Sequence, residues 1–533
     1  MAEQPSTKSC SISQNLSTAG FYLKHWLARF YATRRLIPHH PNLNWSRELK
    51  VFGGTCVAPD FRVREFLFSR VTGATIMATT TSDLLKKYDV PGPRYTSYPT
   101  ILHWNSTPSP DEWIESVRSS LELARTDGTS AAIYIHVPYC RSLCTYCGCN
   151  SRITTKTSVA QPYVQTVLKE WDLYLERLGK SFPILLTELH LGGGTPTFLS
   201  AAELEQLISG ILKTVQTTSD HEFSIESDPR VTRPEQLTTL ARLGFKRLSL
   251  GIQDFDSRVQ LAVNRIQSET QVAVVTERAR AAGFTSINYD LIYGLPFQTL
   301  DSITGTIEAV MRLRPDRIAF YGYAHVPWVK PGQRHFTEAD LPSGDEKRAL
   351  YEHGREMLAA AGYREIGMDH FALATDSLWK TSLNGRLHRN FMGYTSRFVN
   401  PLIGLGVSSI SDSWNMFVQN EKVVEAYIAR VEAGELPFLR GHKLNCEDSV
   451  LRHHILNLMT RFETSWDKPE AYVSYLENIV EELKAFRKDG LLTFSPSHCQ
   501  VTNQGRAFLR NICMAFDAHL ARDTAKKQFS RTI

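Results

Sequence analysis

Short apolar runs and amphipathic stretches alternate along the chain from about residue 130. Six of the runs are rich in β-branched and aromatic residues, as strands are: 131–137, 185–191, 222–227, 247–253, 286–295 and 317–325. Stretches with helical spacing lie between them, at 160–179, 201–216, 233–243, 257–282 and 299–313. Six repeats of a strand followed by a helix predict parallel strands joined by right-handed crossovers. The pattern therefore indicates an α/β fold, either a doubly wound sheet or a complete or partial βα barrel.

Polar, glycine-rich or thiol-bearing residues mark the ends of all six predicted strands. They are a cysteine-rich loop, GGGTPT at 192–197, Glu226 with Asp228, Gln253 with Asp254, Asp290, and His325. In a βα barrel the reacting groups gather at the carboxyl ends of the strands. We therefore expect these residues to share one site.

The composition is that of a large globular protein. The chain has 533 residues, of which 42% are hydrophobic and 22% charged, enough for a substantial core and more than one domain. No apolar run approaches the roughly 20 residues that span a bilayer, and no signal-peptide core precedes a small-residue cleavage site. We expect a cytoplasmic protein without stable membrane insertion, in which reduced thiols serve a metal or redox centre.

The net charge of +5 is concentrated at the N-terminus. Residues 1–76 carry ten Lys or Arg against four Asp or Glu, so the rest of the chain is about neutral. A neutral main body argues against nucleic acid as a partner. The basic segment is either a targeting peptide, which would make the protein organellar, or a disordered tail ahead of a second start at Met77. We favour the tail.

Four of the nine cysteines fall within ten residues, in YIHVPYCRSLCTYCGCN at 134–150. A zinc site often uses two distant Cys-x2-Cys pairs, and this sequence has no second pair. The spacing of Cys140, Cys144 and Cys147 instead suits three corners of a 4Fe-4S cluster, which leaves one iron open to chelate a small molecule. A structural zinc or a set of buried thiols remains the alternative. Cys149 is two residues from Cys147, so in an extended loop their side chains point opposite ways, and we expect Cys149 to line the site without binding iron.

The glycines of GGGTPT fit the same picture. A residue without a Cβ lets main-chain groups approach a ligand closely. Next to the cysteine loop, such a turn suits the amino and carboxylate groups of a methionine moiety.

Ten stretches together resemble the oxygen-independent coproporphyrinogen III oxidase family of the radical SAM (S-adenosylmethionine) superfamily. They are GPRYTSYPT (92–100), YIHVPYCRSLCTYCGCN (134–150), HLGGGTPT (190–197), SIESDPR (224–230), LSLGIQDF (248–255), NYDLIYGLP (288–296), GMDHFA (367–372), LHRNFMGYT (387–395), NICMAFD (511–517) and QFSRTI (528–533). The resemblance runs from about Tyr88 to the C-terminus. It implies a partial, three-quarter βα barrel of six parallel strands with a C-terminal mainly helical domain. The implied boundaries are a basic extension at 1–76, an N-terminal arm at 77–125, the barrel at 126–435 and the helical domain at 436–533.

The resemblance also implies a reaction. The family converts two propionates of coproporphyrinogen III to vinyl groups, giving protoporphyrinogen IX and carbon dioxide in haem biosynthesis. It uses a 4Fe-4S cluster and two molecules of SAM per catalytic cycle, with an electron donor and an acceptor that the sequence does not identify, and it implies a monomer. The alternatives are a haem chaperone of the same superfamily and a non-catalytic iron–sulfur protein. CGCN at 147–150, GPRYTSYPT and QFSRTI favour the oxidase.

Residue roles follow from the matched motifs. Cys140, Cys144 and Cys147 would bind the cluster. Tyr134, Gly193, Glu226 and Ile410 would contact the SAM at the cluster, with Tyr134 and Glu226 in the catalytic machinery. The second SAM site would comprise Tyr146, Gly194, Thr195, Gln253, Arg265, Asp290 and Ala324. Arg389 and Arg531 are candidates for binding the substrate's propionates.

Overall fold

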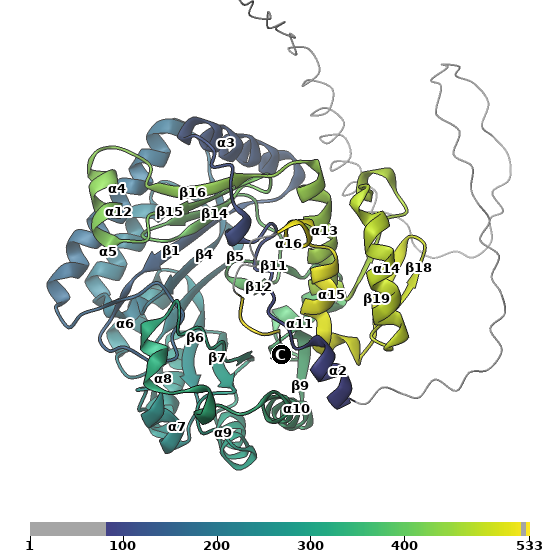
Figure 1. Ribbon diagram of the computed structural model, residues 1–533. Helices are drawn as coiled ribbons and strands as arrows, with labels where there is room; N and C mark the ends of the chain where they lie inside the picture. The colour runs from purple at the N-terminus through teal and green to yellow at the C-terminus, as the bar shows by residue number, and fades with distance from the viewer. Residues whose placement is uncertain (1–80, 524–528, 533) are drawn as a thin grey trace, which may run out of the picture. The chain divides into compact units, whose positions relative to one another are not determined.

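The computed structural model describes residues 81–523 and 529–532 (Figure 1). The described residues belong to one compact unit. The predictions for residues 1–76 and for Met77 lie outside the described residues. No helix within the described ranges is both long and apolar enough to cross a membrane.

A parallel-rich sheet forms the centre of the fold. Its six central strands are β1 (Ala131–Val137), β4 (Leu185–Gly193), β5 (Gln216–Ser227), β6 (Phe245–Gln253), β7 (Ser286–Tyr293) and β8 (Arg317–Gly322). They lie side by side in chain order, and each pairs in parallel with the next. The six predicted strands and their α/β character are thus confirmed.

The sheet extends beyond these strands on both sides, to twelve in all. On one side β13 (Leu402–Leu405) pairs in parallel with β1, followed by the antiparallel strands β14 (Ile410–Asp412), β15 (Met416–Asn420) and β16 (Phe438–Lys443). On the other side β10 (His370–Leu373) and β9 (Tyr363–Gly367) are antiparallel. The predicted boundary at 435/436 falls just before β16, which pairs with β15 and so belongs to the sheet. The division into a barrel and a helical domain stays a prediction.

Helices follow the central strands and bury their apolar faces against the sheet. They are α4 (Ala160–Leu178), α5 (Ala201–Leu212), α6 (Pro234–Arg242), α8 (Glu269–Ala282), α9 (Leu300–Leu313) and α10 (Gly344–Ala360), and α12 (Val424–Glu432), which follows β15, packs into the same core. The short helix α7 (Ser257–Ala262) buries Val259 in a separate cluster with Ile292 of β7. The stretch predicted as one helix at 257–282 is two, because Asn264 adopts a left-handed conformation and Ser268 caps a new helix. Figure 1 shows these helices along the outside of the sheet.

A second core joins the two ends of the described chain. Helix α2 (Thr81–Tyr88), Tyr95 and Tyr98 pack against helices of the C-terminal region. That region contains α13 (Cys446–Arg461), β17 (Glu463–Ser465), α14 (Tyr475–Lys488), β18 (Leu492–Ser495), β19 (His498–Val501), α15 (Leu509–Ala515) and α16 (Ala518–Arg522). The remaining elements are α3 (Pro110–Asp127), β2 (Tyr139–Cys140), β3 (Arg152–Ile153), α11 (Ser377–Leu383), β11 (His388–Asn390) and β12 (Gly393–Thr395). Tyr95 donates a hydrogen bond to Asp517 at 3.0 Å, so the N-terminal arm is built into the C-terminal region.

Candidate functional site

A cavity of about 760 Å³ lies at the carboxyl ends of the parallel strands. It is lined by twelve of the residues predicted from the sequence: Cys140, Cys144, Tyr146, Cys147, Gly193, Gly194, Thr195, Glu226, Gln253, Arg265, Asp290 and Ala324. These residues come from six separate strand ends. The parallel order of the strands is what brings them together.

Two residues expected in this shared site serve the core instead. Asp254 is buried and accepts hydrogen bonds from Gln298 at 2.5 Å and Thr306 at 3.0 Å, which attach α9 to the end of β6. His325 faces the Tyr323 hydroxyl at 3.1 Å and packs beside the ring of Phe336. Neither lines the cavity. The prediction was wrong for both, because a polar residue at a strand end can equally fix the next helix or loop.

The loop that carries the cysteines is fixed at its base and its tip. At the base, β2 pairs with β3. At the tip, Asn264 donates to the carbonyl of Leu143 at 2.7 Å, and Lys330 donates to that of Cys149 at 2.9 Å. Cys140 lies 3.4 Å from the hydroxyl of Thr195, which ties the loop to the glycine-rich turn. The thiols are therefore held in place by contacts from three other parts of the chain.

Two arginines give the thiols a positive environment. Arg230 and Arg265 each donate to Cys144 Sγ at 3.6 Å, and each also contacts Asp228, at 2.7 Å and 3.3 Å. A hydrogen bond from Cys149 lowers the pKa of Cys147 to about 6, with help from Lys330 and Arg265. The thiolate is the form that binds a metal. At Cys140, burial opposes ionisation of the thiol and raises its pKa to about 11.

Cys149 lines the cavity as expected, but the direction of its side chain differs from the expectation. Its main-chain N–H donates to Cys147 Sγ at 3.4 Å, and its thiol is close enough to lower the pKa of Cys147. The two side chains therefore do not point opposite ways, because the loop is not extended here. That Cys149 is not a ligand stays a prediction.

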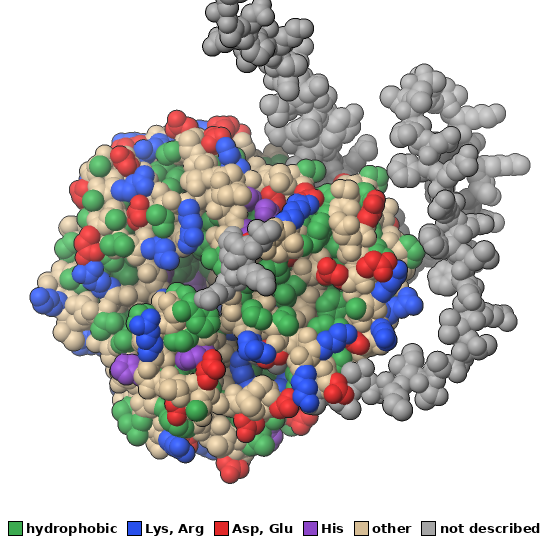
Figure 2. Space-filling model, in the orientation of Figure 1, with side chains coloured by type: hydrophobic (Ala, Val, Ile, Leu, Met, Phe, Trp, Pro, Cys, Tyr) green, Lys and Arg blue, Asp and Glu red, His purple; other side chains and the backbone are tan. Residues whose placement is uncertain are grey.

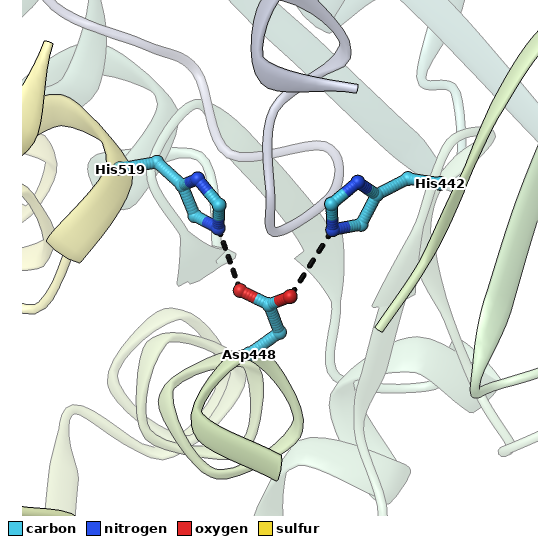
Figure 3. Close-up of side chains that lie close together, drawn as sticks. All are labelled: His442, Asp448 and His519. Atoms are coloured by element: carbon cyan, nitrogen blue, oxygen red, sulfur yellow. Dashed lines mark hydrogen bonds and ion pairs between the residues drawn. The ribbon is translucent and has the colours of Figure 1, made fainter. Parts of the chain in front are cut away.

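The three predicted ligands are not drawn together as tightly as another polar group in the protein. Among the described residues, the group of three or more possible ligands whose atoms all lie within 4.8 Å is His442, Asp448 and His519. In that group Asp448 accepts from both histidines, at 3.1 Å and 2.6 Å, which joins β16, α13 and α16 (Figure 3). The hydrogen bonds among these three residues account for their closeness.

The glycine-rich turn is required by the protein's own packing. A Cβ at Gly194 would lie 2.6 Å from the carbonyl oxygen of Pro138, and Gly194 N–H donates to Val137 at 2.8 Å. Gly193 has a φ of +115°, and its Cβ would meet the ring of His136 at 2.7 Å. The expectation that these glycines let a ligand approach is therefore incomplete. They let β4 approach the start of the cysteine loop.

Glu226 is an anchored carboxylate that faces the cavity. Its side chain is 44% exposed, while it accepts from Gly193 N–H at 3.0 Å and contacts His190 at 3.4 Å. Burial opposes its ionisation, but these partners outweigh burial and lower its pKa below the ordinary value. The ring of Tyr134 stacks on His190 with centroids 5.7 Å apart. Tyr134 lies just outside the cavity lining, beside Glu226.

Ile410 also lies outside the lining, on β14, with β13 between it and Tyr134. Gly404 is the partner of Tyr134 in the sheet register, and a Cβ there would lie 2.5 Å from the carbonyl oxygen of Ile410. Ile410 thus covers the strand next to Tyr134.

Acidic and basic groups face each other across the other side of the cavity. Asp290 accepts from Ser249 at 2.9 Å and Asn288 at 2.8 Å, and burial together with the charge of Glu226 raises its pKa to about 7. Arg265 donates to the carbonyl of Gly251 at 2.6 Å, and its buried Nε has no hydrogen-bond partner. Gln253 has a left-handed backbone, with φ of 68°. Side chains of opposite charge are thus available to a zwitterionic ligand.

Gln333 is a site residue that the sequence did not reveal. It is 1% exposed, and its amide donates to the carbonyls of Tyr146 at 3.0 Å and Ala324 at 3.2 Å and accepts from Val326 N–H at 2.6 Å. It therefore joins the cysteine loop to the end of β8. Arg230 was also missed, although it stands in SIESDPR and its pairing with Asp228 is local.

Neither of the two arginines proposed for the propionates lines the main cavity. Arg389 is buried and stacks on Tyr394 at 4.6 Å. Arg531 pairs with Asp89 at 2.6 Å and lines a smaller cavity next to the main one. That these arginines bind propionates stays a prediction.

Comparison with known proteins gives a consistent result. The model of the Radical SAM superfamily matches residues 134–310. The oxygen-independent coproporphyrinogen III oxidase of Pseudomonas aeruginosa is 39% identical over 459 residues, which is 85% of this chain and 98% of that protein. The enzyme of the same name from Escherichia coli is 38% identical over 457 residues, 84% of this chain and 98% of that protein. The solved structure of the Escherichia coli coproporphyrinogen III oxidase HemN, a radical SAM enzyme, matches with a TM-score of 0.74 at 37% identity, covering 80% of this chain and 98% of that one.

Proposed function

The chain belongs to the oxygen-independent coproporphyrinogen III oxidase family, and from this premise we propose that it decarboxylates coproporphyrinogen III oxidatively to protoporphyrinogen IX in haem biosynthesis. The observation that carries the proposal is that the cysteine loop, the glycine-rich turn and the polar strand ends line one cavity. A motif alone could be fortuitous. Twelve matched residues around one cavity give the resemblance a chemical meaning.

The finer architecture is part of the proposal. We propose that the six parallel strands form a partial barrel and that the C-terminal helical region covers its mouth. The strand order supports an open barrel, because β1 lies beside β13 and β8 lies beside β10. The packing of Tyr95 and Tyr98 into the C-terminal core supports a cover built from both ends of the chain.

Cys140, Cys144 and Cys147 would hold a 4Fe-4S cluster. Soft thiolates suit iron, and the Cys-x3-Cys-x2-Cys spacing on one loop suits three corners of a cubane cluster. Arg230 and Arg265 would balance part of the negative charge of the cluster and its thiolates. When bound, the cluster and SAM supply an oxidant strong enough to remove an unactivated hydrogen atom without oxygen.

Glu226 and Tyr134 would form the wall against which the first SAM lies. The carboxylate of Glu226 is oriented by Gly193 N–H and His190, and its lowered pKa keeps it ionised to accept an ammonium group. Gly193 and Ile410 would complete this wall. Such fixed partners position a reactive cofactor against the substrate and exclude water.

The opposite wall would bind the second SAM. Arg265 can bind a carboxylate through its unpartnered Nε, and Asp290 can bind an amine or a hydroxyl. Tyr146 and Ala324 would be held in register by Gln333, which donates to both of their carbonyls. Gly194, Thr195 and Gln253 would complete the second site.

Other features of the protein remain proposals. We propose a cytoplasmic monomer that exchanges electrons with a donor and an acceptor still to be identified. Figure 2 shows acidic and basic side chains interspersed over the visible face, which agrees with a small-molecule substrate rather than a polyanion. The haem chaperone is the less favoured function, since the matched relatives reported above carry the oxidase name.

Anaerobic turnover tests the function. Protein with a reconstituted cluster is incubated with SAM, a reductant and coproporphyrinogen III, and the porphyrins are separated by chromatography while haem is titrated in parallel. We expect vinyl products and no stable haem complex. SAM cleavage without vinyl product, together with tight haem binding, would favour the chaperone and remove the assignment of the second SAM site.

A further inference from the structure

A second cavity, of about 310 Å³, adjoins the main one. Arg94 and Gly322 line both. The other walls come from β7, α10, β9 with the turn after it, the stretch 503–510 and the last described residues. Seven Lys or Arg residues line this cavity against three acids: Arg94, Lys347, Arg348, Arg355, Arg506, Arg510 and Arg531 against Glu352, Glu365 and Asp369. The lining is therefore strongly basic.

Two of the arginines make their hydrogen bonds to neutral groups. Arg510 donates to the carbonyls of Gly92 at 2.5 Å, Pro93 at 3.0 Å, Arg531 at 3.1 Å and Thr532 at 3.0 Å. Arg94 donates to the carbonyl of Gly322 at 2.6 Å. A main-chain carbonyl orients a guanidinium without neutralising its charge.

Two of the acids in the lining are already engaged. Glu352 pairs with Arg348 and, at 2.7 Å, with Arg355. Asp369 contacts His370 at 2.6 Å. Glu352 is thus shared between two arginines, and Asp369, whose pKa is lowered in part by Arg94 and which also acts on Arg510, is the acid that offsets part of the positive charge of these two residues.

The crowded cations also affect one another. Burial and the neighbouring Arg94 lower the pKa of Lys347 to about 8, and the same two causes lower the pKa of Arg510 to about 10. A bound anion would relieve this repulsion and strengthen the hydrogen bonds to it. The cavity is therefore suited to a carboxylate.

The main cavity is too small for everything that the proposed reaction brings together. Its 760 Å³ lies within the range of a pocket for one ligand, whereas a cluster, SAM and a tetrapyrrole must meet beside the cysteine loop. Resting on the proposed function, we propose that the second cavity binds a propionate carboxylate of coproporphyrinogen III other than the one that is reacting, through Arg94, Lys347 and Arg510. The reacting propionate must reach the cysteine loop, so an anchor in the adjoining cavity holds one of the others.

Binding of coproporphyrin III, the oxidised and fluorescent form, tests this site against its tetramethyl ester. Wild-type protein should bind the acid at least tenfold more tightly than the ester. Arg94→Gln and Lys347→Gln should each weaken binding of the acid roughly tenfold and leave binding of the ester nearly unchanged. Arg94→Lys should recover part of the loss. The matched control is Arg312→Gln, which removes an exposed cation paired with Glu269 outside both cavities.

Several outcomes separate this inference from the function on which it rests. The inference is overturned if wild type binds coproporphyrin III and its ester equally well. It is also overturned if Arg94→Gln and Lys347→Gln both bind the acid with wild-type affinity. Either result counts against the site even if vinyl product forms. If both variants lose the preference for the acid over the ester, the carboxylate site is supported. This holds even if wild type forms no vinyl product; in that case the proposed function is wrong and the carboxylate site stands. Inorganic phosphate added as a competitor at millimolar concentration should weaken acid binding only slightly. Complete competition would mean a general anion site and would overturn the assignment to propionate.

Discussion

Replacing Gly194 by alanine should disturb the cysteine loop without removing any ligand. The added Cβ would lie 2.6 Å from the carbonyl oxygen of Pro138 and 3.0 Å from that of Tyr139. Both atoms belong to the main chain between β1 and the first cysteine, which cannot rotate away as a flexible side chain could. The chain must therefore move by several tenths of an ångström where Cys140 begins the loop.

The size of the effect follows from this displacement. Overpacking of a tight contact costs about 1–3 kcal/mol of folding free energy. A shift approaching 1 Å in a positioned group can lower a rate by roughly 100-fold. We expect Gly194→Ala to keep most of its iron and sulfide, to unfold at a lower denaturant concentration, and to cleave SAM about 10- to 100-fold more slowly than wild type.

Three measurements on one preparation check the reasoning: iron and sulfide content, the denaturation midpoint, and the rate of 5′-deoxyadenosine formation. Gly305→Ala in α9 is the matched control, since a Cβ there meets nothing within 4 Å, and it should keep wild-type rates. Wild-type SAM cleavage by a folded Gly194→Ala protein would refute the claim that this glycine positions the cysteine loop.

Three further predictions concern other groups. Cys147→Ala should lose the cluster signal in electron paramagnetic resonance of the reduced protein, while Cys149→Ser should keep it; a Cys149→Ser protein without a cluster would overturn the three-ligand assignment. Burial raises the pKa of the Glu170 carboxyl group from 4.5 to about 7. The folded state therefore binds the carboxyl proton more tightly than the unfolded state does. The stability that the protonated group contributes is fully present below pH 4.5 and declines as the pH rises to 7. The unfolding free energy of Glu170→Gln minus that of wild type should therefore rise by about 3 kcal/mol between pH 4.5 and 8. A difference that does not change with pH would contradict the raised pKa of Glu170. Asp448→Asn should lower the unfolding free energy by about 1–3 kcal/mol, because His442 and His519 lose a charged acceptor; an unchanged denaturation midpoint would show that this network contributes nothing.

The central strands could be predicted because each contains an apolar run, and β1 and β7 are buried along almost their whole length. Their runs carry enough β-branched and aromatic residues to stand out from the helices between them. Two of the added strands could not be predicted. β13 and β14 have only four and three residues, in a stretch rich in glycine and serine, and β13 pairs with β1, which is distant in sequence. Strands this short leave no local periodicity to detect.

The site residues likewise divide into those that the sequence predicts and those that it does not. The cysteine loop, GGGTPT and Glu226 could be found because each lies in a short contiguous motif at a strand end. Gln333 could not, since its partners are main-chain carbonyls, one of them 187 residues away. Asp254 shows the opposite error: its place at a strand end suggested a site, but its contacts with α9 assign it to the core.

The most direct test of the central claim follows a hydrogen atom from substrate to cofactor. Coproporphyrinogen III labelled with deuterium at the β-carbons of its propionates is incubated anaerobically with cluster-loaded protein, SAM and reductant, and 5′-deoxyadenosine is analysed by mass spectrometry. The account predicts deuterium in 5′-deoxyadenosine together with vinyl product and carbon dioxide. Unlabelled 5′-deoxyadenosine, with the propionates still intact, would contradict it.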